Sequence, residues 1–197
     1  MPVRSNQHIT VRPLTRADTD SLFATVRESI DSLCYWMPWC TPHYSHADAA
    51  TWTALCEIGW RDKTEFPLGI FDAITGRVLG ATGINNINHA YHIGNLGYWL
   101  GTPYRTRGFA SVAALMAADI AFNELGLTRL EIVVLLNNEA SHRVARAVGA
   151  TRECNARNRL YFQGQPAEAT VYSLVASDFP MDRLAANHPL PATRHGS

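Results

Sequence analysis

The feature that most constrains the fold is the segment 130–136, which is apolar at every position except Glu131. A strand that is apolar on nearly both faces needs cover on both sides, so it belongs in the middle of a sheet. Before it, apolar residues recur at the spacing of an amphipathic helix, at Phe109, Val112, Ala113, Met116 and Ile120. Gly126 is suited to end that helix in a left-handed conformation. This order predicts an α/β (α+β) domain.

The remaining patterns predict a mixed central sheet of about seven strands with about four helices. A capping box at Thr15 to Asp18 opens a helix over 16–30, and Ser45 or His46 opens a second one. A further helix follows Asn137 and stops at Gly149. The strands are predicted over 8–14, 66–71, 78–87, 96–100, 130–136, 151–163 and 167–176. One domain therefore spans 1–178, and the proline-bearing segment 179–197 is expected to be a loose tail.

Composition excludes several classes of protein. Seventeen basic side chains balance seventeen acidic ones, so a general electrostatic grip on nucleic acid or on an anionic membrane is not expected. No apolar run reaches the ~18 residues of a membrane span, and residues 1–7 lack the apolar stretch of a secretory signal. Cytoplasmic residence is the resulting expectation.

The cysteines do not form a metal-binding pattern. Four cysteines occur without a CxxC pair, and the nearest cluster is Cys34, Cys40, His43 and His46. Its first spacing is longer than the two to four intervening residues of common zinc sites. We expect reduced, buried thiols and no metal.

The segment Arg105–Ser111 has the composition of an anion-binding loop at a helix start. Backbone N–H groups are unpaired at this end of a helix, where partial positive charge also gathers. Gly108 and the small Ala110 would let the backbone approach an anion, while Arg105 and Arg107 add cationic donors. The loop is neither a Walker motif nor a three-glycine dinucleotide fingerprint. Taken alone, it fits an anion site and a structural turn equally well.

Together with its neighbours, the loop resembles a known family. Gly97-Tyr98-Trp99-Leu100 followed by Pro103-Tyr104-Arg105-Thr106-Arg107-Gly108-Phe109-Ala110 is similar to the acyl-CoA signature of the GNAT superfamily, and the subfamily resembled is the RimJ/RimL type, which acetylates protein N-termini. Segments 125–130, 138–141 and 148–150 agree with it in order and spacing. The likeness covers about residues 8–176. It implies the GNAT fold, with two splayed parallel strands in the middle of the sheet, 96–101 and 130–136.

The resemblance also implies roles for individual residues. Acetyl-CoA is the implied co-substrate, and Asn138 and Ser141 are the implied catalytic residues, with Asn138 also on the pantetheine arm and Ser141 as proton donor to the leaving thiolate. Ser141 alternatively fits a plain helix cap. Backbone groups implied in cofactor binding belong to Tyr98, Trp99, Leu100, Arg105, Thr106, Arg107, Gly108, Phe109, Ala110 and Ser111. The aromatic residues Tyr35, Trp36 and Trp39 are implied on the acceptor side, and a packed helix corner is the alternative.

A carboxylate base is missing where many relatives carry one. Many GNAT enzymes carry it on the strand that leads to the cofactor loop, but no Asp or Glu occurs here between Asp72 and Asp119. Some Rim-type relatives carry an acidic residue beside the tyrosine of the penultimate strand, but here Leu160 precedes Tyr161. The titratable His89, Tyr91 and His92 lie in a hairpin that is expected to be exposed. An α-amine with a pKa of ~7.7–8.0 is partly neutral at neutral pH, whereas a lysine at ~10.4 is almost wholly charged. Weak base machinery therefore favours an α-amine acceptor.

We accordingly expect acetyl transfer from acetyl-CoA to a primary amine, the α-amino group of a protein or peptide N-terminus, by direct attack on the thioester. Two alternatives stay open at this point. One is a small-molecule amine acceptor, such as an antibiotic, a polyamine or an amino-acid derivative, and the other is a non-catalytic CoA-binding module. No nucleic-acid or membrane partner is expected. The oligomeric state is also open, with a homodimer as one option.

Overall fold

The computed structural model describes residues 1–178, and in them eight strands form one mixed sheet in the order β1-β2-β3-β4-β5-β6-β8-β7. Within this sheet only β5 and β6 pair in parallel. The strands are β1 (Arg4–Ser5), β2 (Ile9–Pro13), β3 (Phe66–Asp72), β4 (Val78–Asn88), β5 (Ile93–Leu100), β6 (Arg129–Leu135), β7 (Thr151–Phe162) and β8 (Gln165–Val175).

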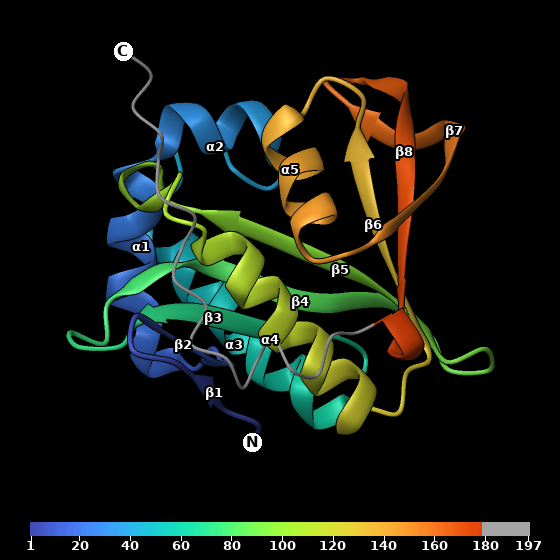
Figure 1. Cartoon of the computed structure of the whole chain (residues 1–197). Helices are drawn as coiled ribbons and strands as arrows, with labels where there is room; N and C mark the ends of the chain where they lie inside the picture. The colour runs from blue at the N-terminus through green and yellow to red at the C-terminus, as the bar shows by residue number, and fades with distance from the viewer. Residues whose placement is uncertain (179–197) are drawn as a thin grey trace, which may run out of the picture.

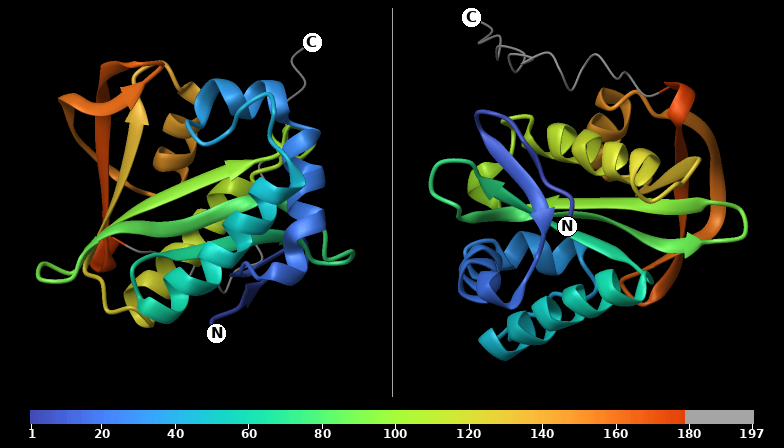
Figure 2. Two further views of the ribbon diagram at one scale, coloured as in Figure 1. Left: turned by 180° about the vertical axis from the view of Figure 1, so that it is seen from behind. Right: turned by 90° about the horizontal axis from the view of Figure 1, so that it is seen from below.

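Helices cover both faces of the sheet (Figures 1 and 2). Helix α4 lies on one face, and α1 and α3 lie on the other, so each face has its own apolar core. The five α-helices of the described part are α1 (Thr19–Arg27), α2 (Ile30–Trp36), α3 (His46–Asp62), α4 (Phe109–Asn123) and α5 (Glu139–Ala147), with short 3-10 turns at Arg16–Asp18, Thr102–Tyr104 and Ala176–Asp178. The predicted mixed sheet with splayed middle strands is confirmed.

The prediction of one helix over 16–30 is wrong. The Thr15 capping box caps the 3-10 turn, and the chain then forms α1 and α2 as separate helices. The break lies at Ser29, whose backbone leaves the helical region at φ −122° and ψ 13°. Its hydroxyl accepts a hydrogen bond of 2.8 Å from the Thr102 amide, so tertiary contact replaces helical continuity. The aromatic segment consequently begins in the last turn of α2 instead of in a connecting loop.

Other differences from the predicted elements are small. β5 begins at Ile93, three residues before the predicted start, and the two-residue β1 was not predicted. Ser45 caps α3 as expected, with its hydroxyl accepting from the Asp48 amide. Gly126 and Gly149 take positive φ angles of 68° and 84°, which confirms both predicted helix stops. The predicted tail 179–197 lies outside the described residues.

The central strand β6 should carry much of the stability. Leu130 is fully buried, and replacing it by Ala should lower the free energy of unfolding by about 2–5 kcal/mol, because transfer energy is lost and a cavity remains. Urea unfolding measures this change. Ile74→Ala is the control, since Ile74 is 90% exposed and should change stability by less than about 0.5 kcal/mol. Equal losses in the two variants would contradict the central position of β6.

Candidate active site

The site is organised by a gap between β5 and β6. The two strands pair only at Ile93–Arg129, Gly94–Leu130 and Asn95–Glu131, and after these pairs they diverge (Figure 1). β6 stays in the sheet because it pairs with β8 along its whole length. The facing edges of β5 and β6 therefore carry backbone groups that no strand covers, which is what an extended amide-bearing ligand could use.

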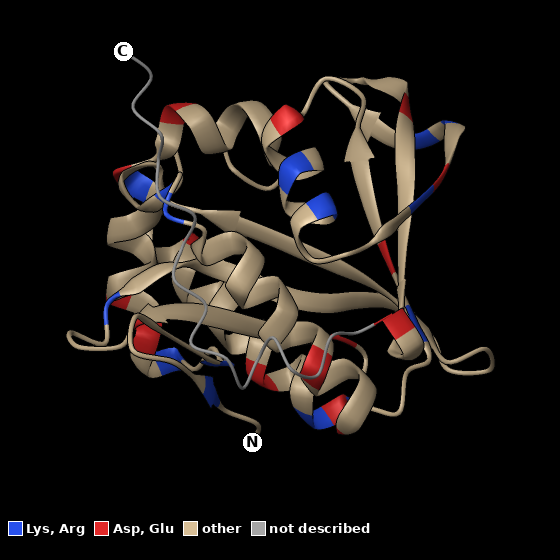
Figure 3. Ribbon diagram, in the orientation of Figure 1, with Lys and Arg blue, Asp and Glu red and all other residues tan. Residues whose placement is uncertain are grey.

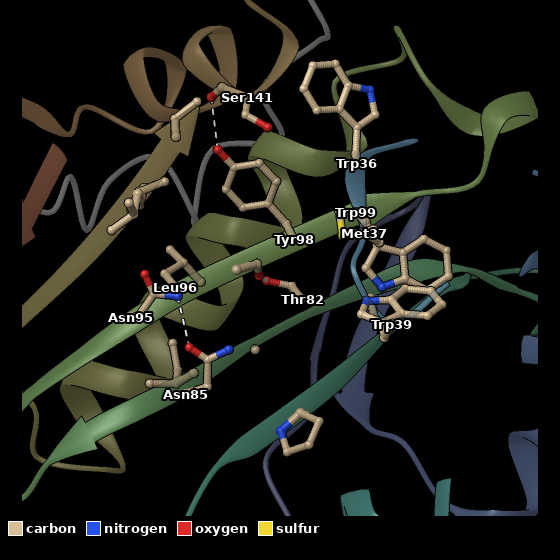
Figure 4. Close-up of a pocket in the computed structure, with 18 of the residues that line it drawn as sticks. Trp36, Met37, Trp39, Thr82, Asn85, Asn95, Leu96, Tyr98, Trp99 and Ser141 are labelled. Carbon is tan, nitrogen blue, oxygen red and sulfur yellow. Dashed lines mark hydrogen bonds between the residues drawn. The ribbon is translucent and has the colours of Figure 1, made fainter. Parts of the chain in front are cut away.

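A groove of ≈ 350 Å³ opens at this gap and runs across β4 and β5 (Figure 4). Its floor includes two glycines, Gly83 of β4 and Gly97 of β5, which pair with each other and keep the floor low. A Cβ atom added at Gly97 would meet nothing within 4 Å, so this position faces open space. The groove is also lined by Asn138 and Ser141 from the start of α5 and by Ile132, Val133, Val134 and Leu135 of β6.

Asn138 and Ser141, which the sequence singled out, lie together at this gap. Asn138 is the N-cap of α5, and its side-chain oxygen accepts a hydrogen bond of 3.1 Å from the Ser141 amide. The helix cap is thus Asn138, which leaves the Ser141 hydroxyl uncommitted to capping. Tyr98 donates from its hydroxyl to the Ser141 carbonyl at 3.0 Å (Figure 4). Burial raises the pKa of the Tyr98 phenol above its ordinary value, so this donor stays protonated.

The loop before α4 presents a run of free backbone amides. Gly108 is the N-cap residue at φ 77°, Thr106 is also left-handed at φ 64°, and no side chain caps the helix. The Arg105 and Ser111 amides bond within the loop, to Thr102 and Gly108. Between them, the amides of residues 106–110 donate to no other group among residues 1–178. Such consecutive donors at a helix start fit a pyrophosphate.

The two arginines of this loop have different environments. Arg105 is half-buried and donates to the Leu100 carbonyl at 3.1 Å and to the Ser32 hydroxyl at 2.6 Å. Desolvation lowers the pKa of its guanidinium, and its bonds tie the loop to α2. Arg107 is exposed and has no ion-pair partner within the described chain. Of the two, only Arg107 is placed to reach an external anion.

The three aromatic residues that the sequence assigned to the acceptor side also differ in where they lie. Trp36 and Trp39 line the groove, and Trp39 packs beside Trp99 with ring centroids 5.7 Å apart. Tyr35 does not line the groove; it lies on the outside, 47% exposed, against Trp36 and Phe162. Sequence reasoning missed Trp52, Glu65, Asn85 and Asn95, which also line the groove and lie far from the recognised motifs.

The titratable hairpin residues and the cysteines are not among the residues that line the groove. His89, Tyr91 and His92 are exposed in the β4–β5 hairpin, as predicted. Cys40 and Cys56 are buried free thiols, and Cys34, half-buried, lies with its sulfur 3.4 Å from that of Cys40. In residues 1–178, no three His, Cys, Asp or Glu side chains are grouped to hold a metal ion. No helix in this range combines the length and apolar character needed to cross a membrane.

Comparison with known proteins identifies the family. The family model described as an acetyltransferase (GNAT) domain matches residues 8–151. The chain belongs to the GNAT acetyltransferases. Within that family, it is 27% identical over 176 residues to the Bacillus subtilis protein named "Putative ribosomal N-acetyltransferase YdaF", covering 88% of this chain and 94% of YdaF.

Two solved structures extend this comparison. One is a ribosomal-protein-serine acetyltransferase from Vibrio cholerae, named as putative, with 29% identity, a TM-score of 0.77, and coverage of 88% of this chain and 97% of that one. The other is RimL, an α-N-acetyltransferase of a ribosomal protein, in complex with coenzyme A. Its TM-score is 0.81 at 17% identity, covering 88% and 98% of the two chains, so it shows likeness of fold alone.

These findings make this protein a GNAT N-acetyltransferase that uses acetyl-CoA as acetyl donor. The free amides at residues 106–110 and the unpaired edges of β5 and β6 fit a pyrophosphate joined to an amide-bearing arm.

The different surroundings of the two arginines can be tested by substitution. Arg107→Gln should weaken coenzyme A binding at least about tenfold in calorimetry, because one charge-assisted hydrogen bond contributes about 1.5–3 kcal/mol, and should leave the melting temperature unchanged. Arg105→Gln should instead lower the melting temperature, since the contacts with Leu100 and Ser32 are lost. The reverse pattern would show that Arg105 is the anion ligand.

Proposed function

We propose that this acetyltransferase modifies the α-amino group of a protein or peptide N-terminus, by direct attack of the amine on the thioester. The observation that carries the proposal is the chemistry of the groove wall beside Asn138 and Ser141. Among residues 1–178 no His lines the groove, and the single carboxylate that does is that of Glu65, just before β3. A site without an adjacent base suits an amine that is already partly neutral at neutral pH, and an α-amine meets this condition.

The donor half of the site is proposed as follows. The amides of residues 106–110 bind the pyrophosphate, with Arg107 as the cationic side chain. Backbone groups of Tyr98, Trp99 and Leu100 bond the pantetheine arm, and Asn138 bonds it from α5. The bound co-substrate supplies an activated acetyl thioester, and the chain's own contribution is to hold it in the gap.

The acceptor amine reaches the gap from the groove. Its nitrogen lone pair attacks the thioester carbonyl, the carbon–nitrogen bond forms and the carbon–sulfur bond breaks. The Ser141 hydroxyl gives its proton to the leaving sulfur and regains one from water, and the proton lost by the amine passes to water. Tyr98 is a positioning residue here, because its hydrogen bond to the Ser141 carbonyl fixes the first turn of α5 against β5. Trp36 and Trp39 exclude water from the acceptor side. The names of YdaF and of the Vibrio cholerae protein support a protein acceptor.

Acceptor class is tested by release of thiol from acetyl-CoA with matched peptides. One peptide carries a free α-amine and no lysine, and the other carries a blocked N-terminus and one lysine. At pH 7 we expect the first to react at least tenfold faster, because a lysine amine is almost wholly protonated. Faster reaction of the lysine peptide, or of free polyamines, would refute the proposed acceptor.

The role of Ser141 is tested by Ser141→Ala. Removing a general acid should lower kcat about 100-fold, whereas the Kd for coenzyme A should stay within about twofold. Ser141→Thr retains a hydroxyl and is the matched control, expected to keep more activity than Ser141→Ala. An unchanged kcat in Ser141→Ala would remove Ser141 from the chemistry without affecting the acceptor assignment.

A further inference from the structure

Three polar residues, Glu65, Asn85 and Asn95, form a row across the groove, and we call them the polar row. The row lies two residues along the strands from Gly83 and Gly97. Asn85 and Asn95 are paired across β4 and β5, and Phe66 of β3 is paired with Ile84 of β4. Glu65 directly precedes Phe66, so this antiparallel register sets it opposite Asn85. All three residues line the groove, although they come from three different segments of the chain.

Glu65 is held in place but has no partner for its charge. A Cβ atom added at Gly59 of α3 would lie 2.8 Å from the Glu65 Cγ, so the glycine makes room for this side chain. Asn95 donates to the Asn85 side-chain oxygen at 2.9 Å (Figure 4). The two amides thus bond to each other, and within residues 1–178 no hydrogen bond or ion pair engages the Glu65 carboxylate.

The Glu65 carboxylate gives the lining of the groove its negative charge. Strands β4 and β5 carry no charged residue, and both are entirely tan in Figure 3. Glu65 is the single charged side chain among the lining residues that the structure describes. Trp36, Trp39 and Trp52 line the same groove, and indole faces attract cations. A half-buried, uncompensated carboxylate interacts more strongly with a cation than a fully exposed one does. The groove therefore favours a positively charged group.

We propose that the polar row is an acceptor subsite for a basic side chain at the second or third residue of the N-terminal peptide, with Glu65 as its ionic partner. This inference rests on the proposed function, since it takes a peptide as acceptor. In the sheet, Glu65 lies two strands away from Gly97 and is offset from it by two residues along the strand direction. The usual spacings of a sheet put these two positions roughly 12 Å apart. An extended chain advances ~3.3–3.6 Å per residue. The long stem of an arginine or lysine at the second or third residue spans the remainder.

The test compares three peptides that differ only at residues two and three, carrying Arg, Gln or Glu there. Arginine is used because its side chain cannot be acetylated. With the unaltered protein at low salt, kcat/KM should rank Arg above Gln above Glu, with about a fivefold or larger difference between Arg and Glu, and added salt should reduce it. The KM for acetyl-CoA should not depend on the peptide.

Substitution of Glu65 tests its part in this ranking. Glu65→Gln should remove the ranking while leaving kcat/KM for the Gln peptide within about twofold, and Glu65→Lys should invert it. Glu168→Gln, at an exposed position of β8 outside the groove, is the control and should retain the ranking. Thermal melts of Glu65→Gln should match those of the unaltered protein, so a loss of ranking is not a loss of folding.

The contrary outcomes separate the two proposals. If peptides are acetylated but the ranking is absent, or survives in Glu65→Gln, the subsite is refuted and the proposed function stands. If no peptide is acetylated while small amines are, the proposed function fails, and the peptide subsite fails with it.

Discussion

The structure depends on the loss of pairing between β5 and β6 after Asn95 and Glu131. Backbone groups that leave a ladder need other partners, so such a gap persists only where the surroundings hold both strands. β6 is held by full-length pairing with β8, and β5 by its pairing with β4. Tyr98 then bridges from β5 to the first turn of α5. The gap is thus fixed from three sides, and both the groove and the free edges follow from it.

A second constraint is the break between α1 and α2, which links the two halves of the site. Ser29 at the break accepts from the Thr102 amide, and Ser32 of α2 accepts from Arg105. These contacts position the loop that leads to the free amides of residues 106–110. The same helix ends in Trp36, which lines the groove. The contact of Ser29 with Thr102 is made where the helix is interrupted, so the local loss of helical structure is accompanied by order at the site.

Local patterns in the sequence were sufficient for most strands and for α3, α4 and α5, because strand alternation, apolar helix spacing and caps are short-range properties. They were not sufficient at Ser29, where the spacing of Leu22, Val26 and Ile30 runs on through the break. Motif resemblance brought Asn138 and Ser141 to the gap, but it could not separate the roles of Arg105 and Arg107. Glu65 had no local signal at all, because only the register of β3, β4 and β5 sets it beside Asn85 and Asn95.

In the proposed reaction, the position of Glu65 matters as much as its charge. A carboxylate in direct contact with the reacting amine would stabilise the ammonium form and raise the pKa of the amine, which opposes attack on the thioester. A carboxylate displaced along the groove attracts a basic peptide without that cost at the reacting nitrogen. The uncharged β4 and β5 lie between Glu65 and the cationic loop at Arg107, so opposite charges mark the two ends of the site. Such an arrangement orients both reactants by charge and keeps the reacting centre between them free of fixed ions.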